Sequence, residues 1–111
     1  MDVAQTKQGK TMILSVSGRL DAVTAPIFEK RLGRLVEEGE TRLVLDLGGL
    51  DYLSSAGLRA ILSVAKKIPK SEGGMTMCNL SGMIREVFSI SGFDGLFPIA
   101  ASVEEALGKA S

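Results

Sequence analysis

The stretch RLVLDLGGLDYLSSAGLR, residues 42–59, decides the fold class. Its opening residues, 42–47, are almost continuously apolar, which is typical of a central strand covered by helices on both faces. Gly48 and Gly49 are expected to close this strand, and residues 50–53 to form a loop. Beyond the loop, apolar side chains return at the spacing i, i+3, i+4, i+7, which predicts an amphipathic helix. These side chains are Leu58, Ile61, Leu62 and Ala65.

Strands and helices alternate on the N-terminal side of this stretch. The segments 3–8 and 11–16 are typical of strands, and the turn signal between them predicts an antiparallel hairpin that ends at Gly18. A first helix is predicted to begin with Thr24 as its N-cap and to end near Gly39. Its apolar face is formed by side chains at helical spacing, namely Phe28, Leu32, Leu35 and Val36.

The alternation continues on the C-terminal side. Pro69 ends the second helix, because the residue before a proline disfavours the helical region. A strand is predicted at residues 75–79, a short helix with Gly92 just past its end follows, and residues 97–100 are typical of a short edge strand. Residues 102–105, Ser-Val-Glu-Glu, form a capping box that begins the last helix.

This order, β-β-α-β-α-β-α-β-α, predicts one α/β domain that spans residues 1–111. Helical crossovers between strands favour a parallel sheet. We therefore expect a mixed, mostly parallel sheet of four to five strands, with an N-terminal antiparallel hairpin and about four helices.

The composition excludes several kinds of chemistry. The 111 residues include no histidine and one cysteine, Cys78. A Ser-His-Asp triad, histidine metal ligands and an internal disulfide are therefore impossible within this chain. Cys78 stands in an apolar stretch and is expected to be a small buried side chain.

Charge and hydropathy also limit the expected partners and compartment. Thirteen basic residues balance 13 acidic ones, so direct nucleic-acid binding through an excess of positive charge is not expected. No apolar run approaches the roughly 18–20 residues that span a bilayer, and the first residues lack the features of a secretory signal. We expect a cytoplasmic protein without membrane insertion.

Two adjacent serines at the start of the second helix are the candidate functional feature. If Ser55 is the N-cap, its hydroxyl accepts a backbone N–H bond, and Gly57 occupies N2, where a glycine leaves room for a close partner. The positive end of the helix dipole would favour a phosphate on Ser55. Local physics leaves two interpretations open, a simple cap or a serine that is modified or binds a ligand.

Residues 42–59 resemble the signature of STAS domains and, more narrowly, that of bacterial anti-sigma factor antagonists. Residues 18–25 resemble that family's segment between the second strand and the first helix, and residues 79–81 with the helix after them also fit. The resemblance covers essentially the whole chain and implies a STAS-like fold with the element order given above.

The resemblance also implies roles for single residues. Placing Gly57 on the glycine of the family's Asp-Ser-(Ser/Thr)-Gly-Leu motif puts Ser55 on the phosphoacceptor and makes Ser54 the alternative acceptor. The expected partner-binding residues are Asp21, Ser54, Gly57 and Arg59. For Asp21, an ordinary exposed loop carboxylate is an equal alternative.

Asp46 matches a further acidic position of the family, and we interpret it as structural.

The function that the resemblance implies needs no catalysis and no cofactor from this chain. The unmodified protein would bind an anti-sigma factor that is also a serine kinase, which would release the sigma factor. Phosphorylation would end this complex, and a metal-dependent serine phosphatase would reset the protein.

Two alternatives remain. The chain could be a STAS subunit that docks on a lipid or anion transporter without phosphorylation. A nucleotide-binding protein or enzyme is the other, although the sequence contains no Gly-Lys-Ser/Thr and no Gly-x-Gly-x-x-Gly motif. A phospho-aspartate receiver fits poorly, because two strands precede the first helix.

Overall fold

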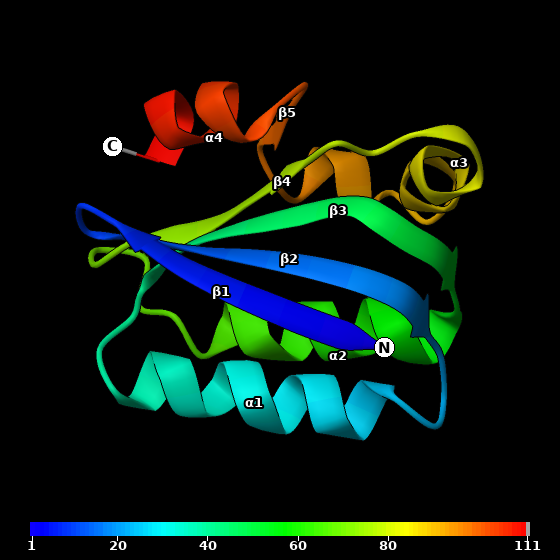
Figure 1. Ribbon diagram of the computed structural model, residues 1–111, viewed down its shortest axis with the longest axis horizontal. Coiled ribbons are helices and arrows are strands. Elements are labelled where there is room, and N and C mark those ends of the chain that lie inside the picture. The colour runs from blue at the N-terminus through cyan, green and yellow to red at the C-terminus, as the bar shows by residue number, and fades with distance from the viewer. Residues whose placement is uncertain (111) are drawn as a thin grey trace.

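Five strands form one sheet in the computed structural model, which describes residues 1–110, and they lie in the order in which they occur in the chain. The elements are β1 (Asp2–Gln8), β2 (Thr11–Leu20), α1 (Ala25–Glu37), β3 (Arg42–Leu53), α2 (Ser55–Lys66), β4 (Gly74–Cys78), α3 (Gly82–Ile90), the 3-10 turn η1 (Phe93–Gly95), β5 (Ile99–Ala100) and α4 (Val103–Ala110). Figure 1 shows α1 and α2 against one face of the sheet, and α3 and α4 on the other side. The predicted fold class and element order are confirmed.

The sheet is mixed, as expected. β1 pairs with β2 in an antiparallel hairpin, and β2, β3, β4 and β5 run parallel to one another. Gly9 lies in the hairpin turn with a φ of 61°, a region that glycine enters without steric cost. β5 has only two residues and forms the edge opposite β1.

β2 and β3 are longer than predicted, and this corrects the assignment of three glycines as strand ends. β2 passes through Gly18 to Leu20, and β3 passes through Gly48 and Gly49 to Leu53. The pairing of the two strands contains register shifts in this region. A Cβ on Gly49 would lie 2.9 Å from the Ser17 Cβ, so these glycines mark irregular pairing and close approach within the sheet.

The main core lies between the sheet and the pair α1 and α2. The predicted apolar face of α1 is buried throughout. The buried face of α2 differs slightly from the prediction, because Leu62 and Ala65 are half-buried and Ala60 and Val64 take their place. Fully buried side chains of this core include Leu14, Leu20, Phe28, Leu32, Leu45 and Ile61.

Cys78 belongs to a smaller apolar cluster under α4, together with Ile13, Val44 and Ala106. Its side chain is fully buried. Burial, helped by the negative charge of Asp46, raises the pKa of the Cys78 thiol to about 11. The prediction of a small buried side chain is confirmed.

Two predicted helix ends agree with the structure, the end of α3 at Gly92 and the start of α4 at Ser102, where one of the two hydrogen bonds of a capping box is present. Gly92 has a φ of 79° directly after the C-cap of α3, and the Ser102 hydroxyl accepts a hydrogen bond from the Glu105 backbone N–H at 3.1 Å. Within residues 1–110, no helix is long and apolar enough to cross a membrane.

Candidate functional site

The predicted site lies at the carboxyl ends of β2 and β3, where the chain enters α1 and α2. Figure 1 shows the first turns of both helices at the same end of the sheet. The two connections are joined by a backbone hydrogen bond of 3.0 Å, which the Ser54 N–H donates to the Leu20 carbonyl. The fold therefore places the 21–24 loop next to the start of α2.

Ser54, and not Ser55, is the N-cap of α2. Ser54 has an extended backbone, and its hydroxyl oxygen accepts a hydrogen bond from the Gly57 N–H at 3.2 Å. Ser54, which follows the end of β3 at Leu53, keeps an extended backbone while its N–H is bonded to the Leu20 carbonyl, and Ser55 is the first helical residue. The predicted cap was therefore one residue too late.

This shift gives the two serines different environments. The Ser54 side chain is partly buried and occupied by the cap. Ser55 is exposed, and its hydroxyl makes no hydrogen bond to any described residue. Ser55 is thus the serine that an external enzyme reaches without breaking an internal contact.

Gly57 has an internal role that differs from the one predicted. It is buried at N3 of α2, and a Cβ there would lie 2.7 Å from the Leu20 carbonyl oxygen and 2.8 Å from the Leu53 Cδ1. The space left by the glycine is therefore filled by β2 and β3. The interpretation of Gly57 as an N2 residue that makes room for a partner is corrected accordingly.

Asp21 organises the loop before α1. Its Oδ1 accepts hydrogen bonds from the backbone N–H groups of Val23 at 3.0 Å and Thr24 at 3.1 Å. The bond from Thr24, aided by that from Val23 and opposed by desolvation, lowers the pKa of the Asp21 carboxyl. Asp21 is half-buried, so it is neither a fully solvated carboxylate nor a free one.

Thr24 stands at the N-cap position of α1 but does not cap the helix with its side chain. Its hydroxyl donates to the Arg19 carbonyl at 2.8 Å and accepts from the Asp21 N–H at 2.9 Å. The predicted capping bond of Thr24 is therefore absent from the described residues, because the hydroxyl is used to close the 21–24 loop.

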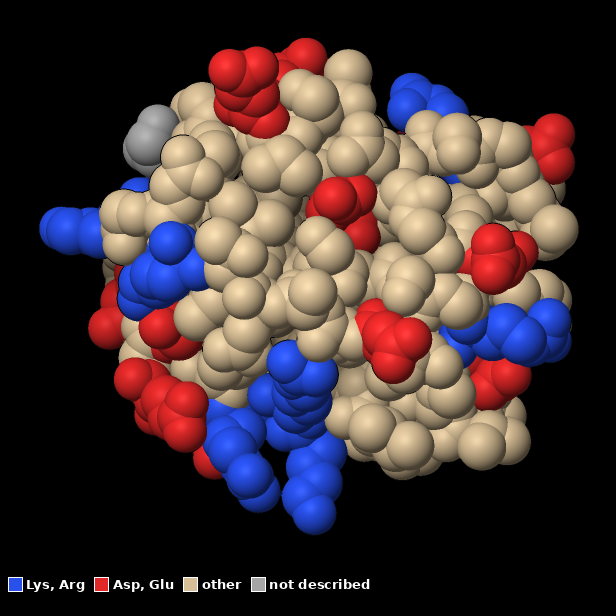
Figure 2. All heavy atoms as spheres, viewed as in Figure 1, with Lys and Arg blue, Asp and Glu red and all other residues tan. Residues whose placement is uncertain are grey.

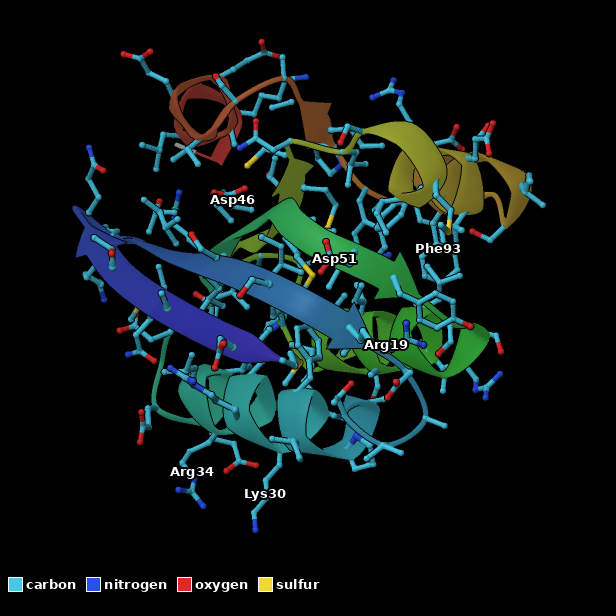
Figure 3. The ribbon with its side chains drawn as sticks, turned by 45° about the vertical axis from the view of Figure 1, so that its right-hand side comes forward. Arg19, Lys30, Arg34, Asp46, Asp51 and Phe93 are labelled. Atoms are coloured by element: carbon cyan, nitrogen blue, oxygen red, sulfur yellow. The ribbon has the colours of Figure 1, made fainter. Side chains whose placement is uncertain are left out.

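Arg19 and Tyr52 form a contact at this end of the sheet that sequence reasoning missed. The Arg19 guanidinium carbon lies 4.2 Å from the centroid of the Tyr52 ring, and the Arg19 Nε lies 3.5 Å from Asp21 Oδ2. Figure 3 shows Arg19 at the end of β2. Arg19 and Tyr52 are register partners, and only the pairing of β2 with β3 brings them together.

Two exposed apolar residues were also missed. Val23, in the loop before α1, is 78% exposed, and Ile27, in the first turn of α1, is 60% exposed. The only signal in the sequence is that Ile27 does not belong to the Phe28–Leu32 stripe of the helix. Both side chains add exposed apolar area beside the predicted site.

Arg59 lies on the solvent side of α2, one turn after Ser55. It makes no hydrogen bond or ion pair with the described part of the chain. α2 contains no acidic residue, and its other charged side chain is Lys66. Arg59 is thus a free cation beside the candidate acceptor.

Asp46 has the structural role that was predicted. Its Oδ1 accepts hydrogen bonds from the Gly48 N–H at 3.0 Å and from the Asn79 side-chain amide at 2.9 Å. These bonds join β3 to the residue after β4, where Asn79 has a φ of 59°. Figure 3 shows Asp46 on the side of the sheet toward α4.

Of the predicted site residues, Ser55 and Arg59 are exposed, Asp21 and Ser54 are half-buried and Gly57 is buried, and none of them lines a described groove. A groove of about 830 Å³ lies near the other end of α2, where its lining includes Arg42, Lys66 and Lys70. On the face shown in Figure 2, basic side chains gather at the lower edge over α1, and acidic ones are scattered elsewhere.

The fold is that of a small α/β domain, and the relatives reported below are named as regulators and not as enzymes. The chain belongs to the STAS domain family, because the family model described as STAS domain matches residues 2–106.

Relatives of known name support the narrower resemblance. The chain is 43% identical to BtrV of Bordetella bronchiseptica, named as an anti-sigma factor antagonist, over 96% of this chain and 91% of that protein. It is 30% identical to the anti-sigma-F factor antagonist RsfB of Mycobacterium tuberculosis, over 86% of this chain and 77% of the relative. The crystal structure of an anti-sigma factor antagonist from Mycobacterium paratuberculosis superposes with a TM-score of 0.90 at 28% identity, over 98% and 92% of the two chains.

Proposed function

We propose that this protein is a cytoplasmic anti-sigma factor antagonist that binds an anti-sigma factor with serine kinase activity and is switched off by phosphorylation of Ser55. The observation that supports the proposal is the difference in hydrogen bonding and exposure between Ser54 and Ser55. Ser54 caps α2, whereas Ser55 is exposed with a free hydroxyl. The names of the relatives support the antagonist role.

The position of Ser55 suits a switch that leaves the fold intact. A phosphate adds about −1.5 to −2 charges and three acceptor oxygens. At the first helical residue of α2 it would lie in the positive field of the helix N-terminus. Because the Ser55 hydroxyl makes no bond with described residues, modification breaks no internal contact. The main effect of the phosphate falls on the partner.

The surface around Ser55 provides both affinity and sensitivity to charge. Val23 and Ile27 offer exposed apolar area, and Arg59 offers a free cation. Asp21 and Arg19 hold the loop that presents Val23. A phosphate buried against partner carboxylates would be repelled, and a loss of roughly 3 kcal/mol is about a hundredfold in affinity.

In this proposal the kinase and phosphatase activities belong to partners. The anti-sigma factor transfers the phosphate from ATP to the Ser55 oxygen, and a metal-dependent serine phosphatase hydrolyses the ester to reset the protein. Docking on a lipid or anion transporter is not favoured, because the two relatives reported above are named as anti-sigma factor antagonists.

Mass spectrometry tests the proposed acceptor. The purified protein and its Ser54→Ala and Ser55→Ala variants are incubated with ATP and each kinase-type anti-sigma factor of the source organism. We expect one added phosphate on Ser55 in the wild type and in Ser54→Ala, and none in Ser55→Ala. A phosphate found on Ser54 in the Ser55→Ala variant would assign the acceptor role to Ser54. Neither phosphate nor complex in any pairing would overturn the proposal.

A further inference from the structure

Ser55 and Arg59 are placed to meet on the solvent side of α2. They are four residues apart, and side chains at this spacing lie one above the other on the same helix face, with Cβ atoms about 5–6 Å apart. Both residues are exposed. An acidic group that precedes its basic partner by four residues has the more favourable orientation relative to the helix dipole. A phosphate on Ser55 would have this relation to Arg59.

Arg59 has no competing partner in the described structure. α2 carries no carboxylate, and its remaining charged residue is Lys66 in the last turn. On α1, the Glu29 carboxylate accepts a hydrogen bond from the Ser63 hydroxyl of α2 at 2.5 Å and is thus engaged away from Arg59. The guanidinium of Arg59 is therefore available either to a protein partner or to a phosphate.

We propose that Arg59 is the intramolecular partner of a phosphate on Ser55, and that phosphorylation withdraws its guanidinium from the surface that the unmodified protein offers to its partner. This inference rests on the proposed modification of Ser55. Phosphorylation would then change the charge of this surface in two ways, because it adds a dianion and pairs the Arg59 cation that was available to the partner. Arginine suits this task because its planar fork donates two parallel hydrogen bonds to phosphate oxygens.

The test installs phosphoserine at position 55 during translation, so that neither a kinase nor a partner is needed. The second pKa of the phosphate is measured by ³¹P NMR titration in the wild type, in Arg59→Gln and in Lys66→Gln. Lys66→Gln is the matched control, because it removes the same charge from the same helix. At 1.5 Å per residue it lies about 16 Å along the axis from Ser55, beyond the Debye length of about 8 Å at physiological salt.

We expect Arg59 to favour the dianion and hold the phosphate pKa down. Arg59→Gln should therefore raise it by about 0.3 unit, a twofold change in proton affinity, whereas Lys66→Gln should leave it in place. The Arg59 Nε–H signal should also move on phosphorylation at pH 7. Equal titration of the two variants, or an unmoved Arg59 signal, would overturn the inference.

Failure of this inference is distinguishable from failure of the proposed function. If a kinase modifies Ser55 but Arg59→Gln titrates like Lys66→Gln, the switch stands and the role of Arg59 falls. If no kinase modifies Ser55, the mass measurement shows it independently of the titration.

Discussion

Ser54 and Ser55 are neighbours in the chain, but their hydroxyl groups have different surroundings in the fold. The Ser54 hydroxyl is bound to the Gly57 N–H, and the Ser55 hydroxyl is exposed and free of described partners. The difference arises because the Leu20 carbonyl holds the Ser54 N–H and fixes where α2 begins. At the scale of single residues, the cap and the candidate acceptor are thereby separated.

This separation predicts that the two serines contribute differently to the stability of the protein. Ser54→Ala should lower the free energy of unfolding by about 1 kcal/mol, because the cap of α2 is lost. Ser55→Ala should change it by less than about 0.5 kcal/mol. Urea unfolding followed by circular dichroism measures both. Equal losses in the two variants would contradict the assignment of the cap.

Asp21 gives a prediction on pH dependence. Its carboxyl has a lower pKa in the folded than in the unfolded protein, so its contribution to stability is present above about pH 4 and is lost as the pH falls through the folded value. Asp21→Asn keeps an acceptor oxygen for the Val23 and Thr24 N–H groups but does not titrate. Between pH 5 and pH 2, the midpoint temperature of thermal unfolding should therefore fall more steeply for the wild type than for this variant. Parallel curves would show that Asp21 is not involved.

At the scale of elements, the decisive contact is that of the first turn of α2 with the end of β2. Gly57 permits it, since its Cβ position is occupied by Leu20 and Leu53. β2 and β3 reach this point because their pairing continues beyond Gly18 and Gly49. The extra strand length thus positions the serines.

Gly57→Ala should test this contact. We expect a loss of about 1–3 kcal/mol in the free energy of unfolding, as is typical when a methyl group is forced into a packed interior. Gly108→Ala in α4 is the matched control, because its Cβ would meet open space and alanine favours a helix. Equal stability of Gly57→Ala and the wild type would contradict the close approach of α2 to β2.

The elements also show what sequence can and cannot predict here. Local patterns identified the five strands and four helices, because the helical spacing of α1 and α2, the apolar run of β3, the hairpin turn and the capping residues all lie within short segments. The 3-10 turn η1 was not predicted. The strand ends, the exact cap and the contact of Arg19 with Tyr52 depend on pairing between segments about 30 residues apart. Short-range sequence patterns do not specify which residues of β2 pair with which residues of β3.

At the scale of the whole molecule, the formal charge is zero, and both basic and acidic side chains occur on the face shown in Figure 2. A phosphate on Ser55 therefore adds a localised dianion to a nearly neutral domain. The acceptor lies outside both apolar clusters, and the fold need not rearrange when it is modified. In the proposed switch, the partner would detect this phosphate at the surface formed by α2 and the 21–24 loop.

The most direct test of this account compares one affinity in two states. The anti-sigma factor that modifies the protein is titrated by calorimetry with the unmodified domain and with the domain carrying phosphoserine at position 55. We predict that the phosphorylated domain stays folded and binds at least about a hundredfold more weakly, which corresponds to roughly 3 kcal/mol. Equal affinities for the two folded forms would contradict the proposed switch.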